Sequence, residues 1–430
     1  MKKYFQNKKN QMQNKYIVDP HLKSWISYDA SCHFPIQNIP LGIFSNEDKT
    51  KRICTIIGDT VIDIHELYRA ITLQNVKTSK PIKGLLQNDY CNDLFQEGKS
   101  VLRALRAQIV ELFDAKNEQH YRKMIQHTLH DVSTVQLHIP IKIPNYTDFY
   151  SSREHATNVG IMFRDPANAL LPNWLHIPVG YHGRASSIVI SGTPIRRPNG
   201  QMRPNDNEAP IYGKTKQLDF ELEMGFVVGK ENTLGEAIPC AEAEDFIQGL
   251  MIFNDWSARD IQKWEYVPLG PFLGKNFASS ISPWIVDLDA IEICRTEGPI
   301  QDPKPLEYLS QDGKNNYDIQ LEVYLNDNLI SQSNMKYLYW SMKQQLAHHT
   351  INGCNMQIGD LCASGTISGP VPESYGSMLE LAWKGTKPIT LADGSTRVFL
   401  QDGDHLRMTA FAECNGFRIG FGEVSGLITS

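Results

Sequence analysis

Asp219-Phe-Glu-Leu-Glu-Met-Gly-Phe226 is the stretch of sequence that most directly indicates the fold class. Acidic and apolar residues alternate along it with the period of a β-strand, which places Asp219, Glu221 and Glu223 on one face. An acidic strand face is usually the solvated edge of a sheet. Three neighbouring carboxylates also repel one another unless a cation lies among them, and their oxygens suit Mg²⁺ or Ca²⁺ rather than Zn²⁺. The alternation alone leaves both interpretations open.

Short apolar or alternating runs, separated by turn residues, occur on both sides of this stretch. They cover residues 187–190, 220–228, 281–286, 319–325, 397–400 and 418–421. Such runs predict a β-dominated domain. Two helices are expected to interrupt it, one with Asp255 as its N-cap and one over residues 341–350.

The segment before this β-rich region has a different character. Residues 34–140 are mixed and contain one convincing helix, for which Ser100 is the expected N-cap. Pro140 and Pro144 then mark a boundary. The sequence therefore predicts a mainly β protein with a small domain at 34–140 and a larger one at 141–430.

The composition is that of an ordinary globular protein. The chain has 430 residues, 41% hydrophobic and 21% charged, and this length exceeds what a single core usually serves. The formal net charge of −6 gives no general reason to expect binding to nucleic acid or anionic lipid. The apolar runs are too short to span a membrane. A membrane protein and a coiled coil are therefore excluded.

Cysteines and the N-terminal segment bear on the cellular compartment. The eight cysteines are too sparse for a disulfide scaffold and none forms a Cys-x-x-Cys pair, which favours a reduced, intracellular protein. Residues 1–33 are polar and carry several lysines but lack the apolar core of a secretory signal. We expect a flexible N-terminal extension there. An organelle transit peptide is the alternative, although such peptides favour Arg and Ser.

A second functional stretch is Asn254-Asp-Trp-Ser-Ala-Arg-Asp-Ile-Gln-Lys-Trp-Glu-Tyr266. If the helix begins at Asp255, the spacing places Asp255, Arg259, Gln262 and Tyr266 on one face. Such a face is either a polar surface stripe or the lining of a pocket where a strand meets a helix. Spacing does not decide between them.

A third stretch, Tyr146-Thr-Asp-Phe-Tyr-Ser-Ser-Arg-Glu-His-Ala-Thr157, is dense in functional groups. Its one histidine, His155, would more often be structural than catalytic without further context. His348 and His349 are adjacent on the expected helix at 341–350 and point in different directions, so they cannot chelate one ion together.

Several long strings closely resemble the fumarylacetoacetate hydrolase family and occur in the order of that family. They are residues 146–160, 171–184, 254–260, 270–275, 365–369 and 376–380. The resemblance extends from about Phe34 to the C-terminus. Shorter relatives that act on acylpyruvates lack a counterpart of the segment 34–38, which favours the long form of the family with its N-terminal domain.

The resemblance implies both a fold and an activity. The fold would be a small SH3-like β-barrel domain followed by a β-sandwich-roll catalytic domain, in a cytoplasmic homodimer. The activity would be hydrolysis of a carbon–carbon bond in 4-fumarylacetoacetate, giving fumarate and acetoacetate in tyrosine and phenylalanine catabolism. The cofactor would be Mg²⁺ or Ca²⁺, and the partner a small-molecule substrate rather than a nucleic acid or a membrane.

The resemblance also assigns site residues by position. Metal ligands would be Asp148, Glu221, Glu223 and Asp255, with Lys275 and Ser279 in the metal environment. His155 would be the catalytic base with Glu380 as its partner, and Arg259, Gln262 and Lys275 would stabilise charge. Substrate contacts would be Tyr150, Arg164, Tyr181, Gln262, Tyr266 and Thr366. Ser279 stands where a threonine is expected; both residues carry a hydroxyl.

Two alternatives remain open from the sequence. An enzyme of the same fold could be an acylpyruvate hydrolase or an oxaloacetate decarboxylase, because fold does not fix substrate. A protein of another class would be a catalytically inactive β protein stabilised by Ca²⁺. Loss of His155 or Glu380 would be the mark of such a protein, and both residues are present.

Overall fold

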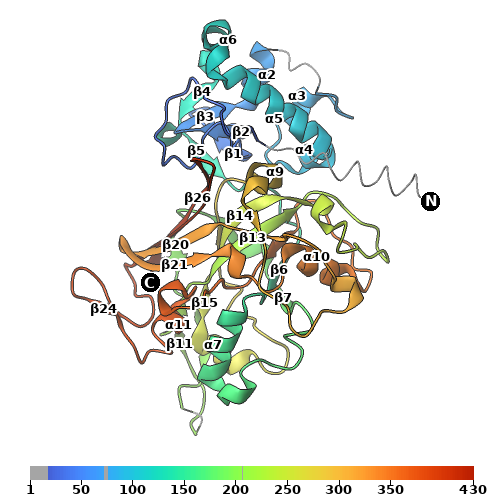
Figure 1. The fold of residues 1–430 in the computed structure, drawn as a ribbon. Coiled ribbons are helices and arrows are strands. Elements are labelled where there is room, and N and C mark those ends of the chain that lie inside the picture. The colour runs from blue at the N-terminus through green and yellow to red at the C-terminus, as the bar shows by residue number, and fades with distance from the viewer. Residues whose placement is uncertain (1–17, 72–75, 206) are drawn as a thin grey trace.

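The computed structural model describes residues 18–71, 76–205 and 207–430 (Figure 1). Up to residue 140 the chain forms a five-stranded antiparallel sheet in the order β4-β3-β2-β1-β5. The strands are β1 (Gly42–Ser45), β2 (Arg52–Ile57), β3 (Thr60–Asp63), β4 (Leu129–Asp131) and β5 (Gln136–His138). The helices are α2 (Ile64–Ala70), α3 (Ile82–Leu85), α4 (Asn92–Gln96), α5 (Lys99–Phe113) and α6 (Glu118–Ile125).

Helix α5 is the helix expected from the sequence, with a different N-cap. Leu102, Leu105 and Ile109 are buried on one of its faces, as the helical period predicts. The N-cap is Gly98 rather than Ser100, which lies inside the helix. Gly98 has φ +85°, a backbone conformation that glycine adopts without steric cost, and this lets the helix begin earlier than the serine indicated.

Part of the expected flexible extension is ordered, because Leu22, Trp25, Ile26 and Tyr28 pack into the N-terminal hydrophobic core. Residues 1–17 lie outside the described chain. The Trp25 ring stacks on Phe113 with centroids 5.1 Å apart. Its indole N–H donates to the Leu112 carbonyl at 3.0 Å. The Trp25 backbone N–H also donates to the Phe113 carbonyl at 3.2 Å, so an aromatic contact and two hydrogen bonds hold this segment to α5.

The rest of the chain is built on an eight-stranded sheet. Seven strands follow the order β7-β6-β22-β13-β14-β16-β8, and β17 pairs with β14. They are β6 (Tyr146–Phe149), β7 (Gly180–His182), β8 (Ile188–Ile190), β13 (Leu222–Val228), β14 (Ile247–Asp255), β16 (Ser279–Ile281), β17 (Val286–Asp287) and β22 (Leu361–Ala363). Every residue of β13 and β14 is buried. The strand with the acidic alternation is therefore central and is not a solvated edge.

A second sheet has the order β21-β20-β25-β26-β9. It consists of β9 (Ile195–Arg196), β20 (Gln320–Leu325), β21 (Asn328–Asn334), β25 (His405–Cys414) and β26 (Phe417–Thr429). Short pairs are β10 (Asn199–Met202) with β11 (Ile211–Lys214), β12 (Leu218–Asp219) with β15 (Ser257–Ala258), β18 (Arg295–Thr296) with β19 (Asn316–Tyr317), and β23 (Ile389–Thr390) with β24 (Thr396–Arg397). One hydrophobic core includes Leu222 and Ile252 of the first sheet with Val323 and Met408 of the second. The mainly β fold expected from the sequence is thus confirmed.

Five α-helices connect these strands: α7 (Arg153–Phe163), α8 (Arg259–Glu265), α9 (Leu288–Ile291), α10 (Met342–Thr350) and α11 (Met378–Leu381). Helix α10 agrees with the expected helix and begins at a capping box of Ser341 and Gln344. The other expected helix start is wrong, because Asp255 is the last residue of β14 and α8 has Ala258 as its N-cap. Pairing of Asp255 with Ser279 on β16 keeps Asp255 in the sheet.

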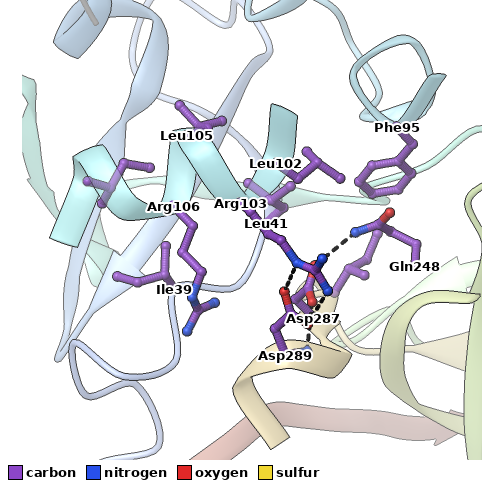
Figure 2. A pocket seen from close by; sticks show the side chains of 12 residues that line it. Ile39, Leu41, Phe95, Leu102, Arg103, Leu105, Arg106, Gln248, Asp287 and Asp289 are labelled. Atoms are coloured by element: carbon purple, nitrogen blue, oxygen red, sulfur yellow. Dashed lines mark hydrogen bonds and ion pairs between the residues drawn. The ribbon is translucent and has the colours of Figure 1, made fainter. Parts of the chain in front are cut away.

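The N-terminal helices contact the larger β structure through α5 (Figure 2). Arg103 of α5 forms a bidentate ion pair with Asp289 of α9, at 2.5 and 2.8 Å. Arg106 donates to the backbone carbonyls of Gln37 and Asn38. Both arginines line a cavity of about 30 Å³. The contact joins two parts of the chain through charge pairing as well as apolar packing.

Two further expectations concern membranes and redox state. No helix in the described ranges is long and apolar enough to cross a membrane. Among the described residues, six cysteines are free thiols: Cys32, Cys54, Cys91, Cys240, Cys354 and Cys362. Cys294 is disulfide-bonded, so the expectation of a fully reduced protein does not hold there. Spacing along the chain does not determine which cysteines folding brings together.

Candidate active site

Four carboxylates meet where the central strands of the eight-stranded sheet end. Asp148 lies on β6, Glu221 and Glu223 lie just before and on β13, and Asp255 ends β14. Strand register brings them together, because Ala363 of β22 pairs with Asp148 on one side and with Gly225 on the other. One oxygen from each carboxylate lies within 4.8 Å of the others. All four residues are buried.

The cluster fits a divalent cation bound through oxygen. Asp148 Oδ1 and Glu223 Oε1 are buried and have no hydrogen-bond partner in the described part of the chain. Burial raises the pKa of Asp148 and of Glu223, and the neighbouring carboxylates raise both further. A cation would satisfy the two bare oxygens and favour the charged form of both groups.

Lys275 and Ser279 hold the carboxylates from outside the cluster. Lys275 Nζ donates to Glu221 at 2.5 Å and to Asp255 at 2.8 Å, and Ser279 Oγ donates to Asp255 at 3.0 Å. Burial alone would lower the pKa of Lys275, but Asp255 and Glu221 raise it overall. Lys275 and Arg259 in turn hold the pKa of Glu221 below its usual value, against the effect of burial. A protonated ammonium has no lone pair, so Lys275 can orient Glu221 and Asp255 but cannot itself bind a cation.

Two tyrosine hydroxyls also contact the cluster. Tyr181 donates to Asp255 at 2.6 Å, and Tyr146 donates to Asp148 at 3.0 Å. Tyr181 was expected as a substrate contact, and it lies where it orients a carboxylate as well. Tyr146 was not predicted as a site residue. Its position two residues before Asp148, on the same face of one strand, was the available signal.

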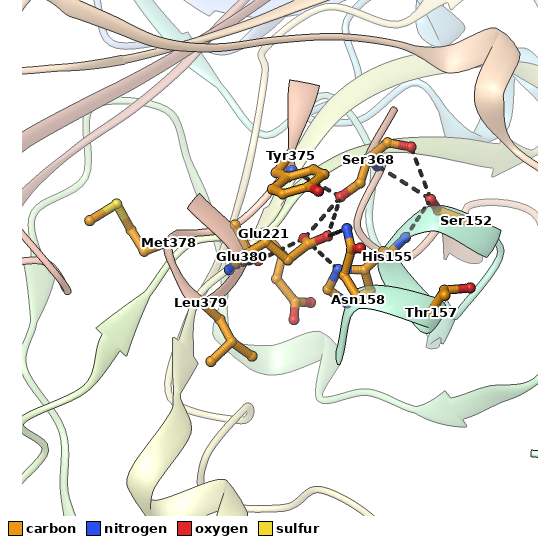
Figure 3. Close-up of polar contacts among 12 residues, drawn as sticks. Ser152, His155, Thr157, Asn158, Glu221, Ser368, Tyr375, Met378, Leu379 and Glu380 are labelled. Atoms are coloured by element: carbon orange, nitrogen blue, oxygen red, sulfur yellow. Dashed lines mark hydrogen bonds and ion pairs between the residues drawn. The ribbon is translucent and has the colours of Figure 1, made fainter. Parts of the chain in front are cut away.

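His155 and Glu380 form a buried pair beside this cluster (Figure 3). His155 lies in the first turn of α7, where Ser152 caps the helix and accepts from the backbone N–H of His155 at 3.2 Å. The His155 Nδ1 and Glu380 Oε2 atoms are 2.6 Å apart. Burial would raise the pKa of Glu380, but His155 and surrounding hydrogen bonds lower it overall. The carboxylate therefore stays charged beside the imidazole.

Three residues around Glu380 were missed from the sequence. Ser377 donates to Glu380 Oε2 at 2.9 Å. Ser368 donates to the same oxygen at 2.9 Å, and Asn158 donates to Oε1 at 2.9 Å (Figure 3). Two of them carried a local signal. Ser377 precedes Glu380 by three residues, which is the spacing of a capping box, and Asn158 lies three residues after His155 on the same helix face. Ser368 carried no such signal.

Arg259 stands between the cluster and the Glu380 helix. Its Nε donates to Asp219 at 2.8 Å, and Nη1 lies 2.7 Å from Glu221 Oε1. Nη1 also donates to the Gln262 side chain at 3.3 Å. The remaining nitrogen, Nη2, is buried and has no hydrogen-bond partner among the described residues. Of the predicted α8 stripe, Arg259 and Gln262 are brought together, while Asp255 reaches the site from a strand.

The other predicted substrate contacts lie at different depths. The half-buried Tyr150 ring lies against His155, with ring centroids 5.1 Å apart, and burial raises the pKa of Tyr150. Thr366 is buried, and its hydroxyl has no partner within the described ranges. Arg164 and Tyr266 are exposed; Arg164 Nη2 donates to the Ala169 carbonyl at 2.6 Å. Among the described residues, the candidate site thus has a buried part that contains polar atoms without hydrogen-bond partners, and a more exposed rim.

The two adjacent histidines contact different groups. His349 Nε2 lies 2.8 Å from the Thr147 hydroxyl, and His348 Nδ1 lies 3.0 Å from the Tyr308 hydroxyl. They face different partners, as expected from adjacent positions on a helix.

Comparison with known proteins identifies two adjoining family regions. Residues 37–140 match the model "Fumarylacetoacetase N-terminal" and residues 145–427 match "Fumarylacetoacetate (FAA) hydrolase C-terminal". The chain is 49% identical to human fumarylacetoacetase over 94% of its length and 98% of that protein. The fumarylacetoacetase of Dictyostelium discoideum is 47% identical over 95% of this chain and 98% of its own.

Solved structures show the same fold at low sequence identity. A fumarylacetoacetate hydrolase from Exiguobacterium antarcticum superposes with a TM-score of 0.52 at 17% identity, covering 91% of this chain and 99% of that one. Because the family regions and the near full-length relatives agree, the chain belongs to the fumarylacetoacetate hydrolase family.

Proposed function

We propose that this enzyme is a fumarylacetoacetase, which hydrolyses 4-fumarylacetoacetate to fumarate and acetoacetate in the last step of tyrosine and phenylalanine catabolism. The observation that carries this proposal is the buried His155–Glu380 pair, 2.6 Å apart, beside a cluster of four carboxylates. Near full-length similarity to curated fumarylacetoacetases supports this substrate over the acylpyruvates and oxaloacetate used by an enzyme of the same fold. The test is loss of the diketone absorbance of 4-fumarylacetoacetate with purified protein, compared with acylpyruvate and oxaloacetate.

A divalent ion, Mg²⁺ or Ca²⁺, would be held by Asp148, Glu221, Glu223 and Asp255. When bound, it would supply Lewis acidity and a template for the two diketone oxygens. Lys275 and Ser279 orient two of these ligands through the contacts to Glu221 and Asp255. Two bare buried oxygens in the cluster support this assignment.

The His155–Glu380 pair activates water. Glu380 accepts the Nδ1 proton of His155, which leaves Nε2 as the basic nitrogen. Nε2 takes a proton from water while the water oxygen attacks the substrate carbonyl next to the double bond. The carbon–carbon bond to the neighbouring methylene then breaks, and its electron pair remains on the acetoacetate fragment. Protonation of that carbon by the imidazolium completes the reaction and restores neutral His155.

Charge that develops on the substrate oxygens needs fixed donors. Arg259 has one unpartnered nitrogen, and Gln262 lies beside it. Lys275 has three N–H groups, of which two are used by Glu221 and Asp255. We assign stabilisation of the developing enolate to these three residues, since preorganised donors usually contribute more than any other effect to the rate of such reactions.

Substrate binding is assigned to residues around and above this centre. They are Tyr150, Arg164, Tyr181, Gln262, Tyr266 and Thr366. Arg164 suits a terminal carboxylate because its planar fork makes two parallel hydrogen bonds.

Arg164→Lys is therefore expected to raise KM about tenfold with little change in kcat, because an ammonium keeps the charge but not the bidentate contact. Steady-state kinetics on 4-fumarylacetoacetate measures both constants. Arg122→Lys, at a surface ion pair with Glu118, is the control and should leave both unchanged. A fall in kcat with constant KM would assign Arg164 to the transition state instead.

Metal affinity is expected to rise with pH. Burial and neighbouring carboxylates raise the pKa of Asp148 and Glu223, so both groups tend to keep their protons in the metal-free protein. An incoming cation must displace those protons, so its binding releases them. Calorimetric titration with Mg²⁺ in two buffers of different ionisation enthalpy counts the protons released. Binding at neutral pH without proton release would contradict this assignment.

We also propose the domain boundaries 34–140 and 141–430, a homodimer, and a cytoplasmic location. The two family regions, 37–140 and 145–427, support the division. Sedimentation equilibrium of the purified protein tests the dimer, and imaging of the tagged full-length chain tests the location.

A further inference from the structure

Asp219 is the member of the acidic stretch that does not join the carboxylate cluster. It ends β12, where it pairs with Ser257 of β15, and it is completely buried at 0% exposure. Two residues farther on, Glu221 faces the cluster, so the chain turns between them rather than continuing one strand. The buried carboxylate of Asp219 therefore has another set of partners.

Those partners belong to two different parts of the proposed machinery. Asp219 Oδ2 accepts from Arg259 Nε at 2.8 Å and from the Leu379 backbone N–H at 3.1 Å. Asp219 Oδ1 accepts from the backbone N–H groups of Met378 and Phe220, at 2.7 and 2.8 Å. Met378 and Leu379 are the first two residues of α11, and Glu380 is the third. One side chain thus ties Arg259 to the backbone that carries Glu380.

The contact also restricts how Arg259 can turn. Asp219 holds Nε on one side and Glu221 lies 2.7 Å from Nη1 on another, so the guanidinium plane is fixed at two points. The nitrogen left over, Nη2, is the one without a partner in the described chain. Without Asp219, Glu221 would be the remaining carboxylate on Arg259 and could draw the guanidinium toward the cluster.

We propose that Asp219 is a positioning residue: it fixes Arg259 relative to the Glu380 helix, so that the unpartnered nitrogen of Arg259 faces developing charge while Glu380 orients His155. This inference rests on the proposed hydrolase function. Asp219 acts through its two partners and does not itself contact substrate. Groups that must act on one substrate within a few tenths of an ångström need such a common support.

Asp219→Asn tests the inference with almost no change in side-chain size. The amide group replaces one accepting oxygen with a donor, which opposes either Arg259 or the N–H groups of α11. We expect kcat on 4-fumarylacetoacetate to fall about 10²-fold, with KM and Mg²⁺ affinity within a few-fold of wild type. Asp404→Asn is the matched control, because Asp404 is equally buried and pairs with Arg397 outside the site. It should lower thermal stability similarly and leave kcat unchanged.

A double-mutant cycle separates positioning from simple loss of stability. Arg259→Lys removes the Asp219–Arg259 contact from the arginine side. Adding Asp219→Asn to Arg259→Lys should therefore lower kcat much less than Asp219→Asn lowers it in the wild-type background. If Asp219→Asn does not fold, Asp219→Ser gives the same test, because serine has a single side-chain oxygen and cannot hold both Arg259 and the N–H groups of α11.

Three results would overturn the inference. In the first, Asp219→Asn keeps the kcat of wild type and loses only thermal stability, as Asp404→Asn does. In the second, the falls in kcat caused by Asp219→Asn and Arg259→Lys multiply fully in the double variant. Inactivity of the wild type on 4-fumarylacetoacetate would refute the proposed function and this inference with it. An active wild type with an unaffected variant refutes the inference alone.

Discussion

His155→Ala is expected to lower kcat on 4-fumarylacetoacetate by about 10²–10⁴-fold, because the variant has no group to take the proton from water. Folding and metal binding should persist, since the His155 ring makes its hydrogen bond to Glu380 and not to a carboxylate of the four-carboxylate cluster. His348→Ala removes a histidine that pairs with Tyr308 outside the site and is the control. Its kcat should equal that of wild type.

Glu380→Gln should cause a loss of similar size by another route. The amide can accept from the imidazole but cannot stabilise the imidazolium, and its NH₂ group opposes the donors Ser368, Ser377 or Asn158. Because His155 and Glu380 act as a unit, the double variant should be scarcely worse than either single one. Fully multiplicative losses would show that they act independently, and the water would then need another base.

Removal of divalent metal is expected to abolish activity, and Mg²⁺ or Ca²⁺ should restore it. Without a cation, Asp148 and Glu223 tend to keep their protons, and the site lacks the Lewis acid that would polarise the diketone oxygens. Activity is measured after dialysis against a chelator, with the metal content verified by elemental analysis. Full activity in verified metal-free protein would refute the assignment of these carboxylates as ligands.

Glu223→Gln tests the same cluster one ligand at a time. Glu223 Oε2 accepts from the Gly365 N–H at 2.9 Å, while Oε1 has no hydrogen-bond partner among the described residues. The amide of Gln can keep the contact with Gly365, but its NH₂ group in place of Oε1 cannot bind a cation. Loss of a residue that only hydrogen-bonds to a metal ligand typically lowers metal affinity by roughly 10–100-fold. Loss of a ligand itself should lower the Mg²⁺ affinity by more than that. Asp404→Asn, a buried carboxylate elsewhere, should bind Mg²⁺ as wild type does.

The acidic stretch shows how far sequence reasoning reached. Alternation correctly placed Glu221 and Glu223 on one side, since a strand has a period of two. It failed for Asp219 because β12 ends there and β13 begins at Leu222. That break depends on pairing with Ser257, and on a bridge from Glu221 to Ser377, which is far away in the sequence. A local pattern cannot report such a partner.

Asp255 shows the opposite case, in which a local signal was overruled. An aspartate before an amphipathic run is a good N-cap, yet pairing with Ser279 extends β14 through Asp255. The mainly β fold could be predicted because many short apolar or alternating stretches of the sequence each indicated a β-strand. The role of Ser368 could not be predicted, because its contact with Glu380 depends on how the segment that carries Ser368 packs against α11.

The burial of β13 and β14 on every residue has a consequence for how the enzyme loses activity. Regions with few buried contacts open first, and the core strands of a protein open only with the whole fold. Glu223 lies on β13, Asp255 ends β14, and Asp148 lies on the buried strand β6, which β22 joins to β13. Fraying of loops and helix ends therefore leaves the spacing of these three carboxylates intact. The carboxylate spacing is thus protected by the same cooperativity that protects the core, and it disappears in a single step when that core melts.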